Sequence, residues 1–273
     1  MRVGLLQLTS TADRDASTEA ALLLIKEAAA AGAQFVLTPE GTPFLAARRE
    51  ETLALACAEA DDPSLPRFQA AAKNAGVWLL IGSIPLRDET TNKLVNRSFL
   101  IAPDGAVRAC YDKIHLFDVD LGAGRIYRES DTYRAGDKAV LADGPWGRLG
   151  MTICYDVRFP HLYRDLGRAG AALIAVPSAF TKWTGEAHWH VLLRARAIET
   201  GAFILAPAQV GDHGGGRLTY GHSLIVGPWG EVLADAGETP GLVIADLDLH
   251  LVEEARRKVP AWSWDQPYDN DRF

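Results

Sequence analysis

The chain has 273 residues, of which 48% are hydrophobic and 23% charged, and its formal net charge at pH 7 is -7. This size and composition predict one soluble globular domain over residues 1–273, with 259–273 as a C-terminal tail. The acidic balance argues against a nucleic-acid partner, whose phosphates require a cationic surface. The sequence has no apolar segment long enough to suggest a membrane span, and no leader-like segment precedes the apolar run that begins at Val3. We therefore expect a cytoplasmic location.

The three cysteines, Cys57, Cys110 and Cys154, are widely spaced and odd in number. They predict neither a disulfide framework nor a thiolate zinc cluster, and they fit a reducing compartment.

The first third of the chain alternates strands with helices. A buried strand is predicted over 3–8, a helix from Asp13 or Asp15 to Gly32, and a second strand over 35–37. That strand runs into Thr-Pro-Glu-Gly, which places Glu40 at its carboxyl end. A helix over 66–75 then leads to a strand over 78–81.

The middle of the chain introduces antiparallel pairing. Segments 96–101 and 106–111 flank a Pro-Asp-Gly turn and predict a hairpin, so the sheets should be mixed. Lys113 follows the hairpin directly. Residues 118–137 lack a clear period and predict a long functional loop that carries Glu129.

The second half again alternates strands and helices. Strands are expected over 139–141, 149–153, 173–176, 203–206, 223–226, 232–234 and 242–245. A helix over about 186–200 is predicted to bury the stripe Ala187, Val191, Ala195 and Ile198. The tail, with Trp262, Trp264, Tyr268 and Phe273, is too aromatic for a simply disordered segment, and we expect it to pack against other residues or another subunit.

The segment 148–160 predicts a strand, a sharp turn and a helix, with Cys154 at the turn. Asp156 is expected to cap the helix and Pro160 to occupy its first turn. A cysteine at the carboxyl end of a strand reaches the crevice where α/β proteins bind ligands, and the positive end of a helix dipole favours its thiolate. Cys154 is therefore a candidate nucleophile; the alternative is a buried cysteine that acts as a small hydrophobic residue.

Glu40, Lys113 and Cys154 all lie at or just after strand ends. This placement suits a cysteine nucleophile with a base that takes its proton and a cation that stabilises an oxyanion. Each residue also has an ordinary reading, because exposed Glu and Lys are common and most single cysteines are packing residues.

At these positions the sequence resembles the nitrilase superfamily of carbon-nitrogen hydrolases. The resemblance rests on Pro39-Glu40-Gly41, on the Tyr-Asp-Lys-Ile-His-Leu segment 111–116, and on the Ile-Cys-Tyr-Asp-Val-Arg-Phe-Pro segment 153–160. It implies an α/β fold, a four-layer α-β-β-α sandwich with mixed sheets, paired through helices into a homodimer or larger homo-oligomer. It also implies a Glu40-Lys113-Cys154 triad that needs no metal and no organic cofactor.

Segments 180–189, 192–200 and 220–223 are similar to the Nit branch, which includes deaminated glutathione amidase and omega-amidase. The implied reaction hydrolyses the linear primary amide of a small acidic substrate through a thioester. Glu129 would help to position the substrate or Lys113, and the backbone N–H of Tyr155 would hold the oxyanion with Lys113. Arg158 could pair with a substrate carboxylate or form a structural salt bridge. His190 stands where many relatives have Glu, so the substrate assignment stays open.

Parts of the sequence also suggest other functions. A metal hydrolase built from His188, His190, His213 and His222 with a carboxylate lacks a helical ligand pair, because residues two apart on a helix face apart. The His-Gly-Gly-Gly segment 213–216 has no serine elbow to accompany it, and Gly122-Ala123-Gly124 is only part of a dinucleotide fingerprint. A carbamoyl compound or a nitrile as substrate, or a catalytically silent binding or assembly subunit of the same fold, remain alternatives that spacing alone does not separate.

Overall fold

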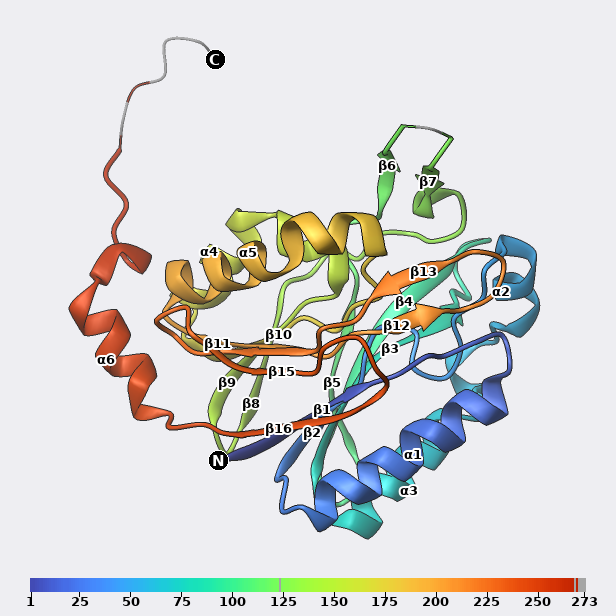
Figure 1. Ribbon diagram of the computed structural model, residues 1–273, viewed down its shortest axis with the longest axis horizontal. Coiled ribbons are helices and arrows are strands. Elements are labelled where there is room, and N and C mark those ends of the chain that lie inside the picture. The colour runs from blue at the N-terminus through green and yellow to red at the C-terminus, as the bar shows by residue number, and fades with distance from the viewer. Residues whose placement is uncertain (123, 268, 270–273) are drawn as a thin grey trace.

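Two six-stranded sheets form the centre of the computed structural model, which describes residues 1–122, 124–267 and 269 (Figure 1). In the first sheet the strand order is β16 (Gly241–Asp246), β1 (Arg2–Gln7), β2 (Phe35–Leu37), β3 (Trp78–Arg87), β4 (Leu94–Ile101), β5 (Val107–Asp112). In the second it is β15 (Val232–Asp235), β14 (Leu224–Val226), β11 (Phe203–Ala206), β10 (Ala171–Ala175), β9 (Gly147–Met151), β8 (Val140–Gly144). Both sheets are mixed: β1, β2 and β3 are parallel and so are β9, β10 and β11, whereas their other neighbours are antiparallel.

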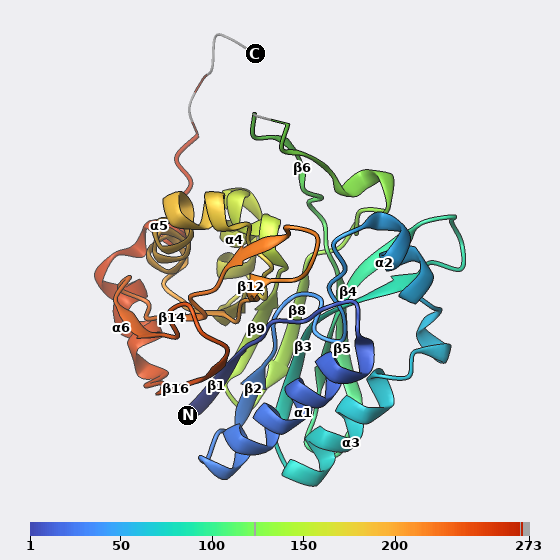
Figure 2. The same cartoon turned by 45° about the vertical axis from the view of Figure 1, so that its right-hand side comes forward.

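Helices cover the outer face of each sheet. The first sheet is covered by α1 (Arg14–Ala30) and α3 (Leu65–Ala75), and the second by α4 (Pro160–Arg168) and α5 (Lys182–Thr200), with α6 (His250–Lys258) beside them (Figures 1 and 2). The layers are therefore α-β-β-α, which confirms the predicted fold class. No helix in the described residues is both long and apolar enough to cross a membrane.

The smaller elements lie between these layers or beyond them. They are α2 (Arg49–Leu55), the 3-10 helices η1 (Glu59–Asp61), η2 (Glu129–Asp131), η3 (Cys154–Arg158) and η4 (Pro260–Trp262), and the two-stranded hairpins β6 (Asp118–Asp120) with β7 (Ile126–Arg128) and β12 (Val210–Asp212) with β13 (Leu218–Tyr220).

The buried residues form two main clusters, one on each face of the first sheet. Along β1, Leu5 packs into the cluster shared with the second sheet, and Leu6 packs into the cluster under α1 and α3. This follows from the two-residue period of a strand, which sends neighbouring side chains to opposite faces. The continuous apolar run that predicted a buried strand at the N-terminus therefore serves two cores.

The predicted core stripe of α5 is wrong. Val191 is 68% exposed and Ile198 is 56% exposed, and Ala187 is exposed as well. The buried face of the helix instead carries Trp189 and Leu193, which are both 0% exposed. The helix has apolar residues on two faces, and helical spacing alone does not indicate which face meets the sheet.

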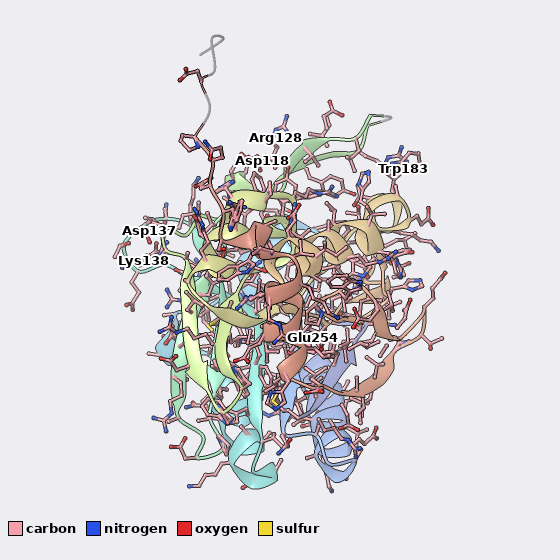
Figure 3. The ribbon with its side chains drawn as sticks, turned by 90° about the vertical axis from the view of Figure 1, so that its left-hand side faces the viewer. Asp118, Arg128, Asp137, Lys138, Trp183 and Glu254 are labelled. Atoms are coloured by element: carbon pink, nitrogen blue, oxygen red, sulfur yellow. The ribbon has the colours of Figure 1, made fainter. Side chains whose placement is uncertain are left out.

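The segment predicted as a long loop contains regular structure. Asp118 of β6 pairs with Arg128 of β7, and this hairpin stands away from the sandwich (Figures 1 and 3).

In the tail, the Trp262 ring lies under the guanidinium of Arg256 at 4.9 Å, so part of the tail does pack on the chain. Trp264 is 72% exposed, and Tyr268 and Phe273 lie outside the described residues.

Candidate active site

Glu40, Lys113 and Cys154 meet at one cavity of about 500 Å³. Glu40 follows the end of β2, Lys113 directly follows β5, and Cys154 follows β9. These strands belong to both sheets, so the cavity lies where strand ends from the two sheets come together. The structure thus brings together the three residues that the sequence placed at separate strand ends.

Glu40 is a buried carboxylate held by three donors. Its Oε1 accepts from Lys113 Nζ at 3.0 Å and from Asn96 Nδ2 at 2.9 Å, and its Oε2 accepts from the backbone N–H of Ala179 at 2.8 Å. The strand β3 passes very close to the backbone before Glu40, because a Cβ built on Gly82 would lie 2.2 Å from the carbonyl oxygen of Thr38. Only glycine fits there, and this close approach fixes the course of the chain into the site.

Lys113 lies between two carboxylates and is 3% exposed. Besides Glu40, its Nζ donates to both carboxylate oxygens of Glu129 at 2.9 Å. Burial opposes the charge on this ammonium, but Glu129 and Glu40 outweigh that effect and hold the pKa of Lys113 well above its ordinary value. The lysine is therefore a fixed cation in the cavity.

Glu129 enters the site from η2, directly after the β6–β7 hairpin. Its Oε2 also accepts from the backbone N–H of Phe117, which precedes the hairpin. Burial, with the nearby charge of Glu40, raises the pKa of Glu129, and Lys113 opposes this shift. The carboxylate therefore connects the hairpin to the buried lysine.

Cys154 occupies a strained backbone position. Its φ is +50°, a left-handed conformation that residues other than glycine rarely adopt, and its N–H donates to the carbonyl oxygen of Pro177 at 2.9 Å. The residue begins the short 3-10 helix η3, whereas the α-helix α4 begins only at Pro160. The expectation that an α-helix dipole acts directly on Cys154 is therefore wrong.

The electrostatics of the site favour a neutral thiol beside an ionised glutamate. Burial raises the pKa of Cys154 well above its ordinary value, and the carboxylate of Glu40 raises it further against the opposing effect of Lys113. For Glu40, burial raises the pKa, but the charge of Lys113 and the hydrogen bonds to the carboxylate outweigh burial and lower it. A base that is ionised next to a protonated thiol is the starting arrangement for general-base catalysis.

Asp156 caps the 3-10 helix η3 and not α4, and it also connects two of the motif segments. Its Oδ2 accepts from Tyr111 Oη at 2.7 Å and from the N–H of Ile153 at 2.8 Å. Its Oδ1 lies 2.7 Å from Nδ1 of His115 and accepts from the His115 N–H at 3.0 Å. The carboxylate thereby fixes the Lys113 segment against the Cys154 turn. The N-cap of α4 is Phe159, because the 3-10 helix η3 lies between Ile153 and α4.

The two remaining predicted substrate-binding residues lie in different places. Tyr155 lines the cavity, and its N–H precedes the first hydrogen bond within η3, which runs from Asp156 to Ile153. Arg158 does not line the cavity. Its guanidinium lies 5.0 Å from the ring of Phe180 and 3.2 Å from Nδ1 of His188, and among the described residues no carboxylate is within 4.0 Å of it.

Sequence reasoning missed several residues that hold the site. Besides its bond to Glu40, Asn96 accepts the N–H of Lys113 on its backbone oxygen at 3.0 Å, and its buried Oδ1 has no hydrogen-bond partner among the described residues. Ala179 acts only through its backbone N–H, so no side chain signals it. Tyr111, His115 and Asp156 stand inside the quoted motifs, and that was the only available signal.

The alternative constellations are not assembled at this site. His213 is buried, with Nδ1 at 2.6 Å from the Ser10 oxygen and Nε2 at 2.6 Å from Thr219 Oγ1. The glycines that follow it form the turn between β12 and β13, at the edge of the cavity. Gly122 and Gly124 flank the turn between β6 and β7, and Ala123 lies outside the described residues.

Comparison with known proteins identifies the family of this site. The carbon-nitrogen hydrolase family model matches residues 2–257. The chain belongs to the carbon-nitrogen hydrolase family. It is therefore an enzyme of the class that hydrolyses carbon-nitrogen bonds such as amides, and the resemblance to the Nit branch of the nitrilase superfamily is confirmed.

Three relatives of this carbon-nitrogen hydrolase illustrate the likeness. The deaminated glutathione amidase of Synechocystis sp. (strain PCC 6803 / GT-S) is 44% identical over 260 residues, which are 94% of each chain. The C. elegans NitFhit protein is 36% identical, with a TM-score of 0.91, over 97% of this chain. The match covers 65% of the NitFhit chain. A variant of the amidase from Nesterenkonia sp. AN1, with acrylamide added at its active site cysteine, is 28% identical with a TM-score of 0.80 over 95% of this chain and 98% of that one.

Proposed function

We propose that this carbon-nitrogen hydrolase is a cysteine amidase that converts the linear primary amide of a small acidic molecule, deaminated glutathione or a close analogue, into a carboxylate and ammonia. The single observation that carries the proposal is the contact of a buried Glu40 carboxylate, a buried Lys113 ammonium and the strained Cys154 at one cavity. The name of the Synechocystis relative supports the substrate.

The first half-reaction forms a thioester. Glu40 takes the proton of the Cys154 thiol while the sulfur attacks the amide carbon, and a tetrahedral intermediate forms. Glu40 then gives the proton to the leaving nitrogen, the carbon-nitrogen bond breaks and ammonia departs. In the second half-reaction Glu40 takes a proton from water, the hydroxide attacks the thioester, and the carboxylic acid leaves with the thiol restored.

In the proposed reaction Lys113 and the backbone N–H of Tyr155 stabilise the oxyanion. The two oxygens of Glu129 lie at the same 2.9 Å from Lys113 Nζ, a geometry that one shared N–H satisfies, and Glu40 takes a second N–H. The third N–H of the ammonium is then available to the substrate oxygen. The backbone N–H of Tyr155 has no acceptor within η3 and supplies the other donor.

The walls of the cavity suit an acidic substrate. Arg49, Arg128 and Arg217 line it, and among the described residues none of the three has a carboxylate within 4.0 Å. The Arg49 guanidinium donates to Thr132 Oγ1 and that of Arg217 donates to the Ala46 oxygen, so both are held in place by neutral groups. Guanidinium groups with uncompensated charge bind a substrate carboxylate well.

We also propose that two copies of the chain pair through the exposed face of α5 and that the enzyme works in the cytoplasm. The support for pairing is the apolar stripe that the sequence predicts as core, because Val191 and Ile198 remain exposed in the single chain. The β14–β15 turn lies beside this stripe, since a Cβ on Gly230 would meet Ile198 at 2.6 Å. A second copy would cover such a surface.

Ammonia release from a panel of substrates tests the proposal. The panel contains deaminated glutathione, 2-oxoglutaramate, glutamine, an N-carbamoyl amino acid and a simple nitrile, and the proteins are the wild type, Cys154→Ala and the matched control Cys110→Ala. We expect the wild type and Cys110→Ala to prefer deaminated glutathione and Cys154→Ala to lose at least about 10³-fold in kcat/KM. Equal background from all three proteins on every compound would contradict an amidase and favour a silent subunit, and carbon dioxide release with the ammonia would favour the carbamoyl substrate.

A further inference from the structure

Three potential metal ligands converge on the second sheet, outside the cavity. Nε2 of His190 lies 3.0 Å from Oδ2 of Asp235, and Nδ1 of His222 lies 2.9 Å from Oδ1 of the same carboxylate. All three ligand atoms lie within 4.8 Å of one another, and none of the three residues lines the cavity. The ligands come from α5, from the turn before β14 and from β15, so distant segments of the chain form the cluster.

The neighbouring residues hold this cluster in place. His222 has a φ of +55°, its N–H donates to the Gly237 oxygen at 2.8 Å, and its carbonyl oxygen accepts from Trp189 Nε1 at 2.8 Å. The ring of Tyr220 stacks on the His222 ring at 4.5 Å, and the Gly237 N–H donates to Asp235 Oδ1 at 2.9 Å. Such supporting contacts orient metal ligands before the metal arrives.

We propose that His190, His222 and Asp235 form a binding site for a divalent transition metal of the zinc type, separate from the catalytic cavity. Two neutral imidazoles and one carboxylate carry one negative charge, and nitrogen and oxygen donors of this kind suit zinc, cobalt and nickel. In a tetrahedral zinc site each ligand atom lies about 2.0–2.1 Å from the ion, so the ligand atoms lie about 3.3 Å from one another. The two nitrogen-to-carboxylate distances of 3.0 and 2.9 Å are close to that spacing, so small shifts make room for the ion.

The site leaves a metal position open to water. The side chains of His190, His222 and Asp235 are 33%, 19% and 32% exposed, so an ion can enter without opening the core. An ion there would join α5, which carries His190, to the β14–β15 hairpin, which carries Asp235 and is preceded by His222. Because none of the three ligands lines the catalytic cavity, we assign the ion a stabilising role on this side of the molecule.

The helical spacing that argued against a histidine metal site applies only to His188 and His190. His188 faces Arg158, at 3.2 Å from its Nη1, whereas His190 meets a ligand from a different segment. His188 is therefore a matched control: it is a histidine on the same helix, two residues away, with no part in the cluster.

Cobalt binding tests the site. Tag-free, metal-stripped wild type, His188→Ala, His190→Ala and His222→Asn are titrated with Co²⁺, followed by visible absorption and by the thermal unfolding midpoint. Asn is chosen at His222 because it tolerates a left-handed backbone. We expect one Co²⁺ per chain and a raised unfolding midpoint in wild type and His188→Ala, with affinity at least about tenfold weaker in His190→Ala and His222→Asn.

Any of three outcomes would overturn the metal site. One is no Co²⁺ binding by the folded wild type up to millimolar metal. The second is binding by His190→Ala and His222→Asn with wild-type affinity. The third is an ultraviolet thiolate-to-cobalt band that places the ion on a cysteine. Circular dichroism of each apo protein confirms that a loss of binding is not a loss of fold. The amidase assay is run in parallel on the metal-stripped wild type. Because Co²⁺ binding is measured by absorption and by the unfolding midpoint, its result does not depend on the proposed function.

Discussion

Cys154 starts the proposed reaction as a neutral thiol, because the two largest influences on it act in the same direction. Burial and the Glu40 carboxylate both raise its pKa, and only Lys113 opposes them. A cysteine ion pair of the kind formed with a protonated histidine is therefore not the resting state. The proton moves to Glu40 as the sulfur attacks, so the carboxylate must remain ionised, as its lowered pKa ensures.

Alkylation of Cys154 by iodoacetamide tests this protonation state. Because the pKa of the thiol lies above its ordinary value of 9.0, the thiolate fraction at pH 7 is small and the wild-type rate should keep rising as the pH increases beyond 9. Glu40→Gln removes the carboxylate that raises this pKa, so its Cys154 should alkylate faster than wild type at pH 8, although the variant no longer hydrolyses amides. Peptide mapping separates Cys154 from Cys57 and Cys110.

The opposite order of rates would contradict this view of the site. If Glu40→Gln alkylates more slowly than wild type at pH 8, Glu40 stabilises a thiolate instead of a thiol. Asp131→Asn, on the exposed side of η2, serves as the control and should alkylate at the wild-type rate.

At the residue scale, the sequence predicted the catalytic candidates but not the groups that hold them. Glu40, Lys113 and Cys154 are recognisable because reactive residue types follow strand ends in three separate motifs. The donors to Glu40 are a backbone N–H from Ala179 and the side chain of Asn96, which lies far from Glu40 in sequence. Contacts of this kind arise only from the tertiary fold. For the same reason, the hydrogen bonds that Asp156 accepts from Tyr111 and His115 could not be predicted from the sequence.

Among the elements, the β6–β7 hairpin has the most direct connection to the chemistry. It delivers Glu129 to Lys113, and its strand residues Ile126, Tyr127 and Arg128 line the cavity. The Arg125 guanidinium lies 4.0 Å from the ring of Trp183, which ties the hairpin to the first turn of α5. Figure 3 shows Trp183 on the same side of the molecule as the hairpin.

Replacing Glu129 with Gln should lower kcat much more than it changes KM. The amide keeps the size of the side chain but removes the charge that faces Lys113, and its NH2 group is a poor neighbour for the ammonium. We expect kcat to fall by about 100-fold. Asp131→Asn in the same 3-10 helix should retain wild-type kcat, and steady-state kinetics with deaminated glutathione measure both.

A wild-type kcat in Glu129→Gln would mean that Glu129 has no part in positioning Lys113. A rise in KM with an unchanged kcat would assign Glu129 to substrate binding alone.

The helices and strands with a clear hydrophobic period were predictable. The spacing did not show which of the two apolar faces of α5 is buried. Its buried face includes Arg196, whose Nε donates to the Val157 oxygen at 2.8 Å and whose Cζ lies 5.4 Å from the Tyr163 ring. The buried face thus combines this charged residue with Trp189 and Leu193, while the exposed face also carries apolar residues, so α5 departs from the usual pattern. The β6–β7 hairpin was missed because its strands are only three residues long.

For the whole molecule, the same ambiguity becomes a prediction about assembly. Val191→Glu with Ile198→Glu places two charges on the exposed face of α5, where the proposed pairing would bury them. We expect the wild type to have twice the mass of one chain or more by light scattering, and the double variant to dissociate at least about 100-fold more readily. Leu23→Glu, an exposed leucine of α1 on the opposite layer, should leave the assembly unchanged.

A wild type that stays monomeric at tens of micromolar, or a double variant that pairs as tightly as wild type, would exclude this face as the interface.

The four-layer architecture itself was predictable from the alternation of elements and from the family resemblance. Which outer face is covered by a partner depends on apolar residues that only the structure places on the surface.

The central claim is that catalysis passes through a thioester on Cys154, and the mass of the acid-quenched protein tests it most directly. Wild type mixed with deaminated glutathione and quenched during turnover should gain the mass of the substrate minus ammonia, on the peptide that contains Cys154. Cys154→Ala should gain no mass and release no ammonia. Turnover by Cys154→Ala at the wild-type rate, or an adduct on a different residue, would contradict the account.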